Sequence, residues 1–169
     1  VIYVVRDPRN IVTSFSKFRS LTVEQTADFM ISGTGDGLVW TNNWSVNYHS
    51  WKLFKEYERY LLVKYEDLIS EPDKTFLNIL EFIHKLNKTN FKLDKKKFEN
   101  VIKTTSFDSM QKLEKEKGFT ESWVDEKTGK KIPFFYLGPK NDWREILESK
   151  YSEEISKKYE FEMRELGYL

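Results

Sequence analysis

Two short runs of apolar, β-forming residues constrain the fold of this chain more than any other feature. They occupy residues 1–5 (VIYVV) and 60–65 (YLLVKY). A strand with one solvated face alternates polar and apolar residues, whereas these runs do not, so each is predicted to be covered on both faces. The segment between them is mainly helical in pattern, and strands joined in this way normally pair in parallel. The sequence therefore predicts an α/β fold with parallel strands flanked by helices.

The first helix is predicted immediately after the first strand. Asp7 can cap its N-terminus, and Pro8 suits its first turn, where no backbone N–H is needed. Ile11, Phe15 and Phe18 follow at i, i+4 and i+7, which predicts a single apolar face.

Further helices are predicted from apolar periodicity and from residues typical of helix ends. They are a short helix from the Thr22–Gln25 capping box to Met30, an aromatic helix through Trp40, Trp44, Tyr48 and Trp51 towards Tyr57, and helices over 73–85, 92–102 and 151–166, the last before a C-cap at Gly167. Residues 32–37 (SGTGDG) are predicted to form a loop, and residues 123–141 show little periodicity. No repeat or linker divides the chain.

Composition excludes several classes of site. Lys and Arg number 28 against 27 Asp and Glu, so the net charge of +1 predicts no general attraction to nucleic acid or to an anionic membrane. The absence of cysteine excludes disulfides and cysteine-based metal sites and permits a reducing cytoplasm. No apolar run approaches the roughly 18 residues that a transmembrane helix needs. Val1 enters a strand directly, which predicts that an N-terminal part of the protein precedes it.

Three polar side chains are predicted to meet at one edge of the sheet. Arg6 follows the first strand, Ser14 lies about two turns into the next helix, and Tyr65 ends the second strand. Ligands of parallel α/β sheets bind beyond the carboxyl ends of strands, and a guanidinium offers a planar fork for a phosphate. These residues are therefore candidates for an anion site. The alternative is a surface pair of Arg6 with Asp7, with Ser14 exposed.

Several segments resemble, in order, the PAPS-dependent sulfotransferases of the cytosolic type, where PAPS is 3′-phosphoadenosine 5′-phosphosulfate. YVVRDPRNIVTSFSKF is similar to the family's 3′-phosphate-binding segment, and LLVKYEDLISEPDKTFLNILEFI to its Tyr-Glu-Asp strand, turn and helix. TTSFDSMQKLEKEKG resembles its adenine loop, FFYLGPKNDWREIL its late Gly…Asp-Trp loop, and FEMRELGYL its usual ending. The resemblance implies a partial three-layer fold of the P-loop type, with residues 1–169 as the C-terminal part of one sulfotransferase domain.

The resemblance also implies roles for individual residues, with PAPS as the sulfuryl donor and no metal. Those implied to bind the nucleotide are Arg6 and Ser14 at the 3′-phosphate, Tyr65 beside adenine and ribose, Thr105, Ser106, Phe107 and Met110 around the base, and Tyr136, Leu137 and Gly138 in the late loop. The family places Arg-Lys directly before this glycine. Tyr136 and Leu137 stand there in this chain, so two phosphate-binding cations are missing, and Lys140 or Arg144 could compensate.

The family's phosphosulfate loop and catalytic histidine both lie upstream of the arginine strand. The SGTGDG segment has no following Lys-Ser/Thr and does not replace the loop. His49 is predicted to be a packed or surface residue of an aromatic helix, and His84 to lie near a helix end. No catalytic residue is therefore assigned within this chain, and these residues alone are predicted to be inactive.

The leading hypothesis is thus part of an enzyme that transfers a sulfuryl group from PAPS to a hydroxyl or amine of a small-molecule or glycan acceptor. A cytoplasmic location is expected, without nucleic acid as a partner. The segment REILESKYSEE lacks the Thr-Val pair of the family's dimerisation stretch, so the oligomeric state is not predicted. The alternatives are a non-catalytic module that binds an anion or nucleotide, and a fragment of another nucleotide kinase of the P-loop type.

Overall fold

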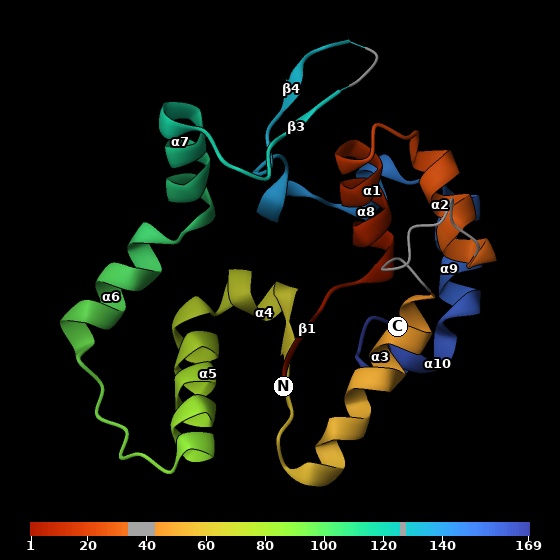
Figure 1. The fold of residues 1–169 in the computed structure, drawn as a ribbon. Coiled ribbons are helices and arrows are strands. Elements are labelled where there is room, and N and C mark those ends of the chain that lie inside the picture. Colours follow the sequence, from red (N-terminus) through yellow and green to blue (C-terminus); the bar gives the residue numbers. More distant parts are fainter. Residues whose placement is uncertain (34–42, 126–127) are drawn as a thin grey trace. The chain divides into compact units, whose positions relative to one another are not determined.

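The computed structural model describes residues 1–33, 43–125 and 128–169 (Figure 1). Contacts divide the chain into two compact units. The first unit consists of Val1–Arg6 and Trp51–Lys117, and the second of Asp7–Ser50 and Gly118–Leu169. Within the described ranges, no helix combines the length and the apolar character that crossing a membrane requires.

The first unit contains the two predicted strands. β1 (Ile2–Val5) and β2 (Leu61–Lys64) pair in parallel, and their register runs from Ile2 opposite Leu61 to Val5 opposite Lys64. The predicted parallel pairing is therefore confirmed, whereas the predicted covering of both faces is not, because the Val4 side chain is 52% exposed. The second strand ends one residue earlier than predicted, because Tyr65 is already the first residue of a helix.

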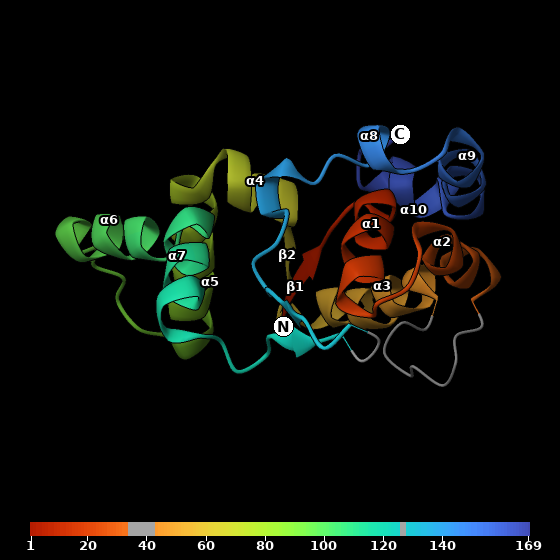
Figure 2. The same ribbon diagram turned by 90° about the horizontal axis from the view of Figure 1, so that it is seen from above.

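Four helices and a 3-10 turn accompany these strands. They are α4 (Tyr65–Ser70), α5 (Pro72–Asn87), α6 (Lys95–Thr104), α7 (Phe107–Lys117) and η2 (Leu53–Tyr57). α5 contacts both α4 and β2 (Figures 1 and 2). Thr75 supports this contact, because its hydroxyl donates a hydrogen bond to the Asp67 carbonyl oxygen at 3.1 Å.

The second unit is built mainly from helices. They are α1 (Pro8–Phe18), α2 (Val23–Ser32), α3 (Trp44–Lys52, of which the last two residues belong to the first unit), α8 (Trp143–Ile146), α9 (Ser149–Lys158) and α10 (Glu160–Glu165). α1 contacts α2, α8 and α9, as Figure 2 shows from above. A small antiparallel hairpin of β3 (Trp123–Val124) and β4 (Lys131–Ile132) and the 3-10 turn η3 (Gly138–Lys140) complete the unit.

The N-caps predicted from sequence are confirmed, whereas the last helix is capped by Leu166, one residue before the predicted Gly167. The Asp7 carboxylate accepts a hydrogen bond from the Arg9 backbone N–H at 2.9 Å, at the N-terminus of α1. Thr22 and Gln25 form the reciprocal capping box of α2. Gly33 ends this helix with a φ of +70°, a conformation that glycine adopts without steric cost. The rest of the predicted SGTGDG loop and Trp40 lie outside the described residues.

The core of the second unit gathers around the C-terminal helices. Its side chains without measurable exposure include those of Val12, Ile155, Tyr159 and Met163. The Tyr159 ring meets the Trp44 ring edge-on at 5.3 Å, and its hydroxyl donates to the Met30 carbonyl oxygen at 2.7 Å. Burial raises the pKa of Tyr159 to about 12, so the hydroxyl remains a donor. Tyr159 also separates α9 from α10, so the predicted single closing helix is two helices.

The buried face of α1 differs from the predicted one. Val12, Thr13 and Ser16 are buried, whereas Ile11 and Phe15 are only partly covered. The two hydroxyl residues are satisfied by hydrogen bonds, among them one from the Ser16 hydroxyl to the Thr13 carbonyl oxygen at 3.0 Å. Apolar periodicity missed this face because Thr13 and Ser16 are polar.

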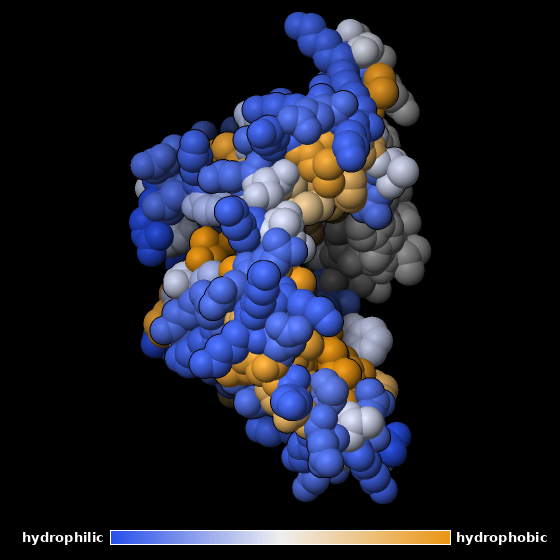
Figure 3. Space-filling view, turned by 90° about the vertical axis from the view of Figure 1, so that its left-hand side faces the viewer, coloured by the Kyte–Doolittle hydropathy of each residue, from blue (hydrophilic) through white to orange (hydrophobic). Residues whose placement is uncertain are grey.

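The first unit buries far less apolar surface. Among the described hydrophobic residues, only Val5 and Val63 belong to both this unit and the buried class. Aliphatic side chains of α5, α6 and α7 remain exposed, including those of Ile83, Val101 and Leu113. Figure 3 shows such hydrophobic residues at the surface among hydrophilic ones.

The second unit's core makes a direct prediction. Ile155→Ala is expected to lower the free energy of unfolding by about 2–5 kcal/mol, because it leaves a cavity where no solvent reaches. Ile146→Ala is the matched control, since the Ile146 side chain is 39% exposed and its truncation is expected to cost below about 1 kcal/mol. Urea denaturation measures both values. Equal losses would contradict the placement of the core.

Candidate functional site

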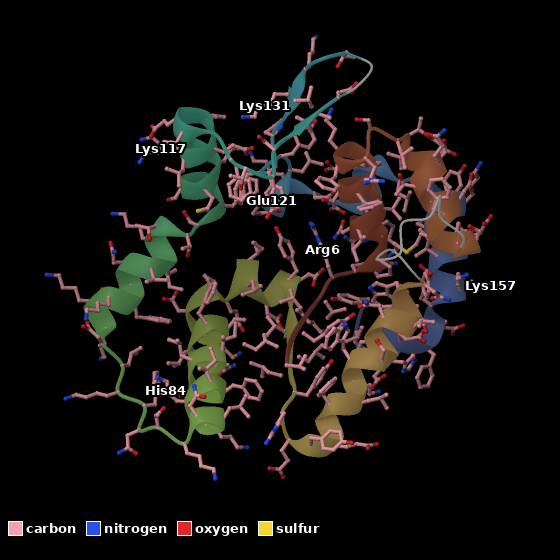
Figure 4. All side chains as sticks on the ribbon, viewed as in Figure 1. Arg6, His84, Lys117, Glu121, Lys131 and Lys157 are labelled. Carbon is pink, nitrogen blue, oxygen red and sulfur yellow. The ribbon has the colours of Figure 1, made fainter. Side chains whose placement is uncertain are left out.

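Arg6 and Tyr65 lie together at the carboxyl ends of the two strands. Because Val5 and Lys64 are opposite each other in the sheet, the residues that follow them emerge side by side. The Arg6 guanidinium carbon lies 4.1 Å from the centroid of the Tyr65 ring. Figure 4 shows the Arg6 side chain extending beyond the end of β1. The structure thus brings a cation and a phenol to this edge of the sheet.

Asp7, which was predicted as an alternative partner of Arg6, forms an ion pair with Arg9. The Asp7 carboxylate accepts hydrogen bonds from Arg9, at 3.0 Å from Nε and 2.7 Å from Nη2. Both side chains are more than nine-tenths buried. Arg9 is therefore the structural ion-pair partner of Asp7 in the second unit.

The predicted adenine segment lies in the same unit as Arg6. Thr105 and Ser106 form the exposed connection between α6 and α7, whereas Phe107 and Met110 belong to α7 itself. The Thr105 hydroxyl donates to the Val101 carbonyl oxygen at 2.7 Å, and so caps the end of α6. The segment therefore begins as a short connection and continues as a helix, and its Phe107 and Met110 side chains are half-buried.

Asn141 attaches the late loop to α1. The Thr13 hydroxyl donates to Asn141 Oδ1 at 2.6 Å, and Asn141 Nδ2 donates to the Asn10 carbonyl oxygen at 2.9 Å. We call these two hydrogen bonds the Asn141 bridge. The Trp143 backbone N–H adds a third contact by donating to Asn10 Oδ1 at 2.9 Å. The bridge holds the residues around Gly138 against the helix that carries Ser14.

Ser14 and Gly138 both lie in the second unit. Ser14 is exposed on α1, directly after the bridged Thr13. Gly138 has a φ of +51°, where a side chain would be strained. The two residues before it, Tyr136 and Leu137, are respectively exposed and half-buried.

Two cations near this loop differ in their contacts. Arg144 is occupied by Asp142, with Nη1 3.2 Å from Oδ1, and its guanidinium carbon lies 4.7 Å from the Trp143 ring centroid. Lys17 of α1 was not singled out from sequence, yet its Nζ lies 5.1 Å from the centroid of the Tyr136 ring. The sequence feature that could have identified Lys17 is its position three residues after Ser14, which places both on one face of the helix.

Arg9 was also missed by sequence reasoning, and its role is structural. Its guanidinium carbon lies 4.1 Å from the Trp143 ring centroid, and Nη2 donates to the Tyr168 carbonyl oxygen at 2.9 Å. Arg9 therefore joins the start of α1 to the late loop and to the end of the chain.

Both histidines lie on helices and contact other side chains. His49 Nε2 lies 2.9 Å from Glu162 Oε1, and the Ser45 hydroxyl donates to that same oxygen. Burial raises the pKa of the Glu162 carboxyl, but hydrogen bonds from Ser45, the backbone and His49 outweigh it and lower the pKa overall. His84 Nδ1 lies 2.6 Å from the Thr89 hydroxyl near the end of α5. Across the described part of the chain, no group of three or more His, Asp or Glu side chains could hold a metal ion.

Comparison with known proteins gives a consistent picture. The family model described as the sulfotransferase domain matches residues 1–167. Human sulfotransferase 2A1 is 24% identical over 170 residues, which cover 98% of this chain and 57% of that protein. The guinea pig (Cavia porcellus) 3-beta-hydroxysteroid sulfotransferase is 25% identical over 167 residues, which cover 96% of this chain and 55% of that protein.

A solved structure shows the same fold. Mouse sulfotransferase SULT7A1, crystallised as a complex with PAP, superimposes with a TM-score of 0.68 at 19% identity. The match covers 96% of this chain and 57% of the mouse chain. The present chain thus spans a little over half the length of the relatives it matches.

The Asn141 bridge generates a stability prediction. Asn141→Ala is expected to lower the free energy of unfolding by about 1–3 kcal/mol, because it removes both hydrogen bonds of the bridge and leaves the buried Thr13 hydroxyl only its weaker contact with the Asn10 carbonyl oxygen, at 3.0 Å. Asn100→Ala, at an exposed position of α6, is the control and is expected to cost below about 0.5 kcal/mol. Limited proteolysis after Lys140 should also accelerate only in the Asn141 variant. An Asn141→Ala protein as stable as the control would contradict the bridge.

The Glu162 carboxylate generates a pH prediction. Its lowered pKa means that its stabilising effect is present above pH 4.5, the ordinary value, and is lost as the pH falls through the lowered pKa. Glu162→Gln is therefore expected to destabilise the protein by about 1–3 kcal/mol at pH 7, and this difference should shrink towards pH 3. Glu160→Gln, on the exposed face of α10, should show neither effect. Denaturation at a series of pH values tests this, and a pH-independent difference would refute it.

Proposed function

Because this chain belongs to the sulfotransferase domain family, we propose that the complete protein transfers a sulfuryl group from PAPS to a hydroxyl or amine acceptor. The observation that carries the proposal is the placement of Arg6 over Tyr65 at the paired carboxyl ends of β1 and β2. This is the edge at which parallel α/β sheets bind their ligands. Membership of this family argues against the alternative hypothesis that the chain is part of a P-loop nucleotide kinase.

The proposed task of Arg6 is recognition of the 3′-phosphate. A guanidinium presents paired N–H donors in a plane, which suits two oxygens of one phosphate, and such charge-assisted hydrogen bonds are short and strong. The Tyr65 ring supports the guanidinium from one face by a cation–π contact. Holding the guanidinium in place before the ligand arrives reduces the entropy lost on binding.

We assign the remaining nucleotide contacts by resemblance. Ser14 serves the 3′-phosphate with its exposed hydroxyl, and Gly138 allows the backbone to approach the same group. Thr105 and Ser106 hold the adenine together with the side chains of Phe107 and Met110. In support, the two exposed hydroxyls and the half-buried apolar side chains occur within one short segment.

PAPS supplies an activated sulfuryl group, which the acceptor oxygen or nitrogen attacks while the bond to the 5′-phosphate oxygen breaks. The chain's own residues bind and orient the nucleotide for this in-line displacement. Orientation of this kind is a large catalytic contribution, about 7–11 kcal/mol in favourable cases. By resemblance to the family, in which both lie upstream of the arginine strand, we place the general base and the phosphosulfate loop in an N-terminal part of the same domain.

The proposed acceptor is a small molecule, with a glycan as the second class. Two of the relatives are named as hydroxysteroid sulfotransferases, which supports an acceptor with a hydroxyl group. We also propose a cytoplasmic location, as in the cytosolic-type family, and no role for nucleic acid.

Binding of two nucleotides tests the function. Adenosine 3′,5′-bisphosphate (PAP) and adenosine 5′-monophosphate (AMP) differ only in the 3′-phosphate. In the complete protein, Arg6→Ala is expected to weaken PAP binding about 10- to 100-fold, because it removes a charged hydrogen-bond donor, and to leave AMP binding within about twofold. Isothermal titration calorimetry measures all four dissociation constants.

Arg164→Ala is the control, because Arg164 is an exposed arginine of α10 paired with Glu160. It should change neither dissociation constant. A complete wild-type protein that binds PAP no more tightly than AMP would overturn the proposed function.

A further inference from the structure

The late loop lacks positive charge at the two positions directly before Gly138. Tyr136 and Leu137 stand there, and neither can neutralise a phosphate. A phosphate monoester carries between one and two negative charges at neutral pH, so a single guanidinium leaves part of that charge uncompensated. If this chain binds the nucleotide as proposed, we expect a further cation outside these two positions to contribute.

Lys17 is placed to supply that charge. It lies in the last turn of α1, and its Nζ is 5.1 Å from the centroid of the Tyr136 ring. The negative face of an aromatic ring attracts an ammonium group over this range. An ammonium has three N–H donors, and the ring faces only one side of it, so donors remain for a ligand. Lys17 is exposed and forms no ion pair within the part of the chain that the structure describes.

Ser14 and Lys17 share one face of α1. Residues three apart on a helix are neighbours, so the Ser14 hydroxyl and the Lys17 ammonium project from adjacent positions. The Asn141 bridge attaches the late loop to this helix through Thr13, and Tyr136 belongs to that loop. Helix and loop therefore present a hydroxyl and an aromatic-supported cation within one unit.

We propose that Lys17, held over Tyr136, is a phosphate-binding residue that replaces the missing basic pair of the late loop. Together with Ser14 it takes the 3′-phosphate of the nucleotide, so this inference rests on the proposed function. In this arrangement, position 136 carries an aromatic ring that supports a cation, instead of the basic residue that the family has there. The positive charge is then supplied by α1 and not by the loop. Lys17 thereby determines selectivity for nucleotides that carry a 3′-phosphate.

Other cations near the loop are less suitable. Arg144 already contacts Asp142 and the Trp143 ring. Lys140 is exposed in η3, and no aromatic ring or carboxylate contact positions it among the residues described. Lys17 could instead serve only the C-terminal dipole of α1. That purely structural role predicts a change in stability without a change in nucleotide selectivity.

The test uses the dissociation constant of AMP divided by that of PAP, measured on the complete protein. A high value of this ratio means selectivity for the 3′-phosphate. Lys17→Gln is expected to lower this ratio about tenfold, the loss of one charge-assisted hydrogen bond, with the AMP dissociation constant within about twofold of wild type. Tyr136→Phe should retain the ratio because the ring remains, whereas Tyr136→Leu should lower it. Lys157→Gln is the matched control on α9 (Figure 4) and should leave the ratio unchanged.

Each alternative result has a defined meaning. A wild-type ratio near one overturns the proposed function and this inference together. A high wild-type ratio that Lys17→Gln retains overturns the inference alone, whether or not the thermal midpoint of unfolding changes. A ratio lost in Lys140→Gln but retained in Lys17→Gln assigns the charge to Lys140 and also overturns it. Equal weakening of PAP and AMP by Lys17→Gln would show that the lysine does not read the 3′-phosphate.

Discussion

The buried amide of Asn141 is the contact on which the second unit's arrangement depends. It accepts a hydrogen bond from Thr13 and donates one to the backbone of Asn10, and both residues lie on α1. Apolar packing favours burial but tolerates sliding, whereas hydrogen bonds of fixed direction permit one register of loop against helix. A buried amide also carries a penalty when it is left unpaired, so alternative registers are disfavoured. The position of Gly138 relative to Ser14 follows from this contact.

In the first unit, the parallel register of two four-residue strands has the corresponding role. It aligns Val5 with Lys64, and the following residues, Arg6 and Tyr65, therefore meet. A shift of one residue would turn each side chain to the opposite face of the sheet. The proposed recognition of the 3′-phosphate by Arg6 would consequently depend on main-chain pairing as much as on the chemistry of the side chain.

The proposed role of Lys17 illustrates how a binding site can keep its charge while the residues that carry it change. A phosphate is stabilised by positive charge close to its oxygens, and any segment of the chain that reaches this position can provide the charge. Once the loop is fixed along α1, a lysine of the helix and a ring of the loop can together replace a basic residue of the loop. The ring orients the ammonium, which limits the flexibility that makes isolated surface lysines weak binders.

Local features of this protein can be read from its amino-acid sequence alone. Apolar runs identified both strands, Asp7 and the Thr22–Gln25 pair identified helix starts, and the spacing of Arg6 from Ser14 supported the family and the candidate site. Such features can be read because strand pattern, capping and turn chemistry depend on neighbours along the chain.

Contacts between side chains that are distant in the sequence became visible in the folded structure. Polar Thr13 and Ser16 form the buried face of α1 because Asn141 and backbone carbonyls satisfy them, which apolar periodicity cannot anticipate. The packing of Tyr159 against Trp44 accompanies the break between α9 and α10. Lys17 contacts Tyr136, although the two residues are more than a hundred positions apart in the sequence. Sequence patterns cannot predict this contact, because they depend on neighbours along the chain.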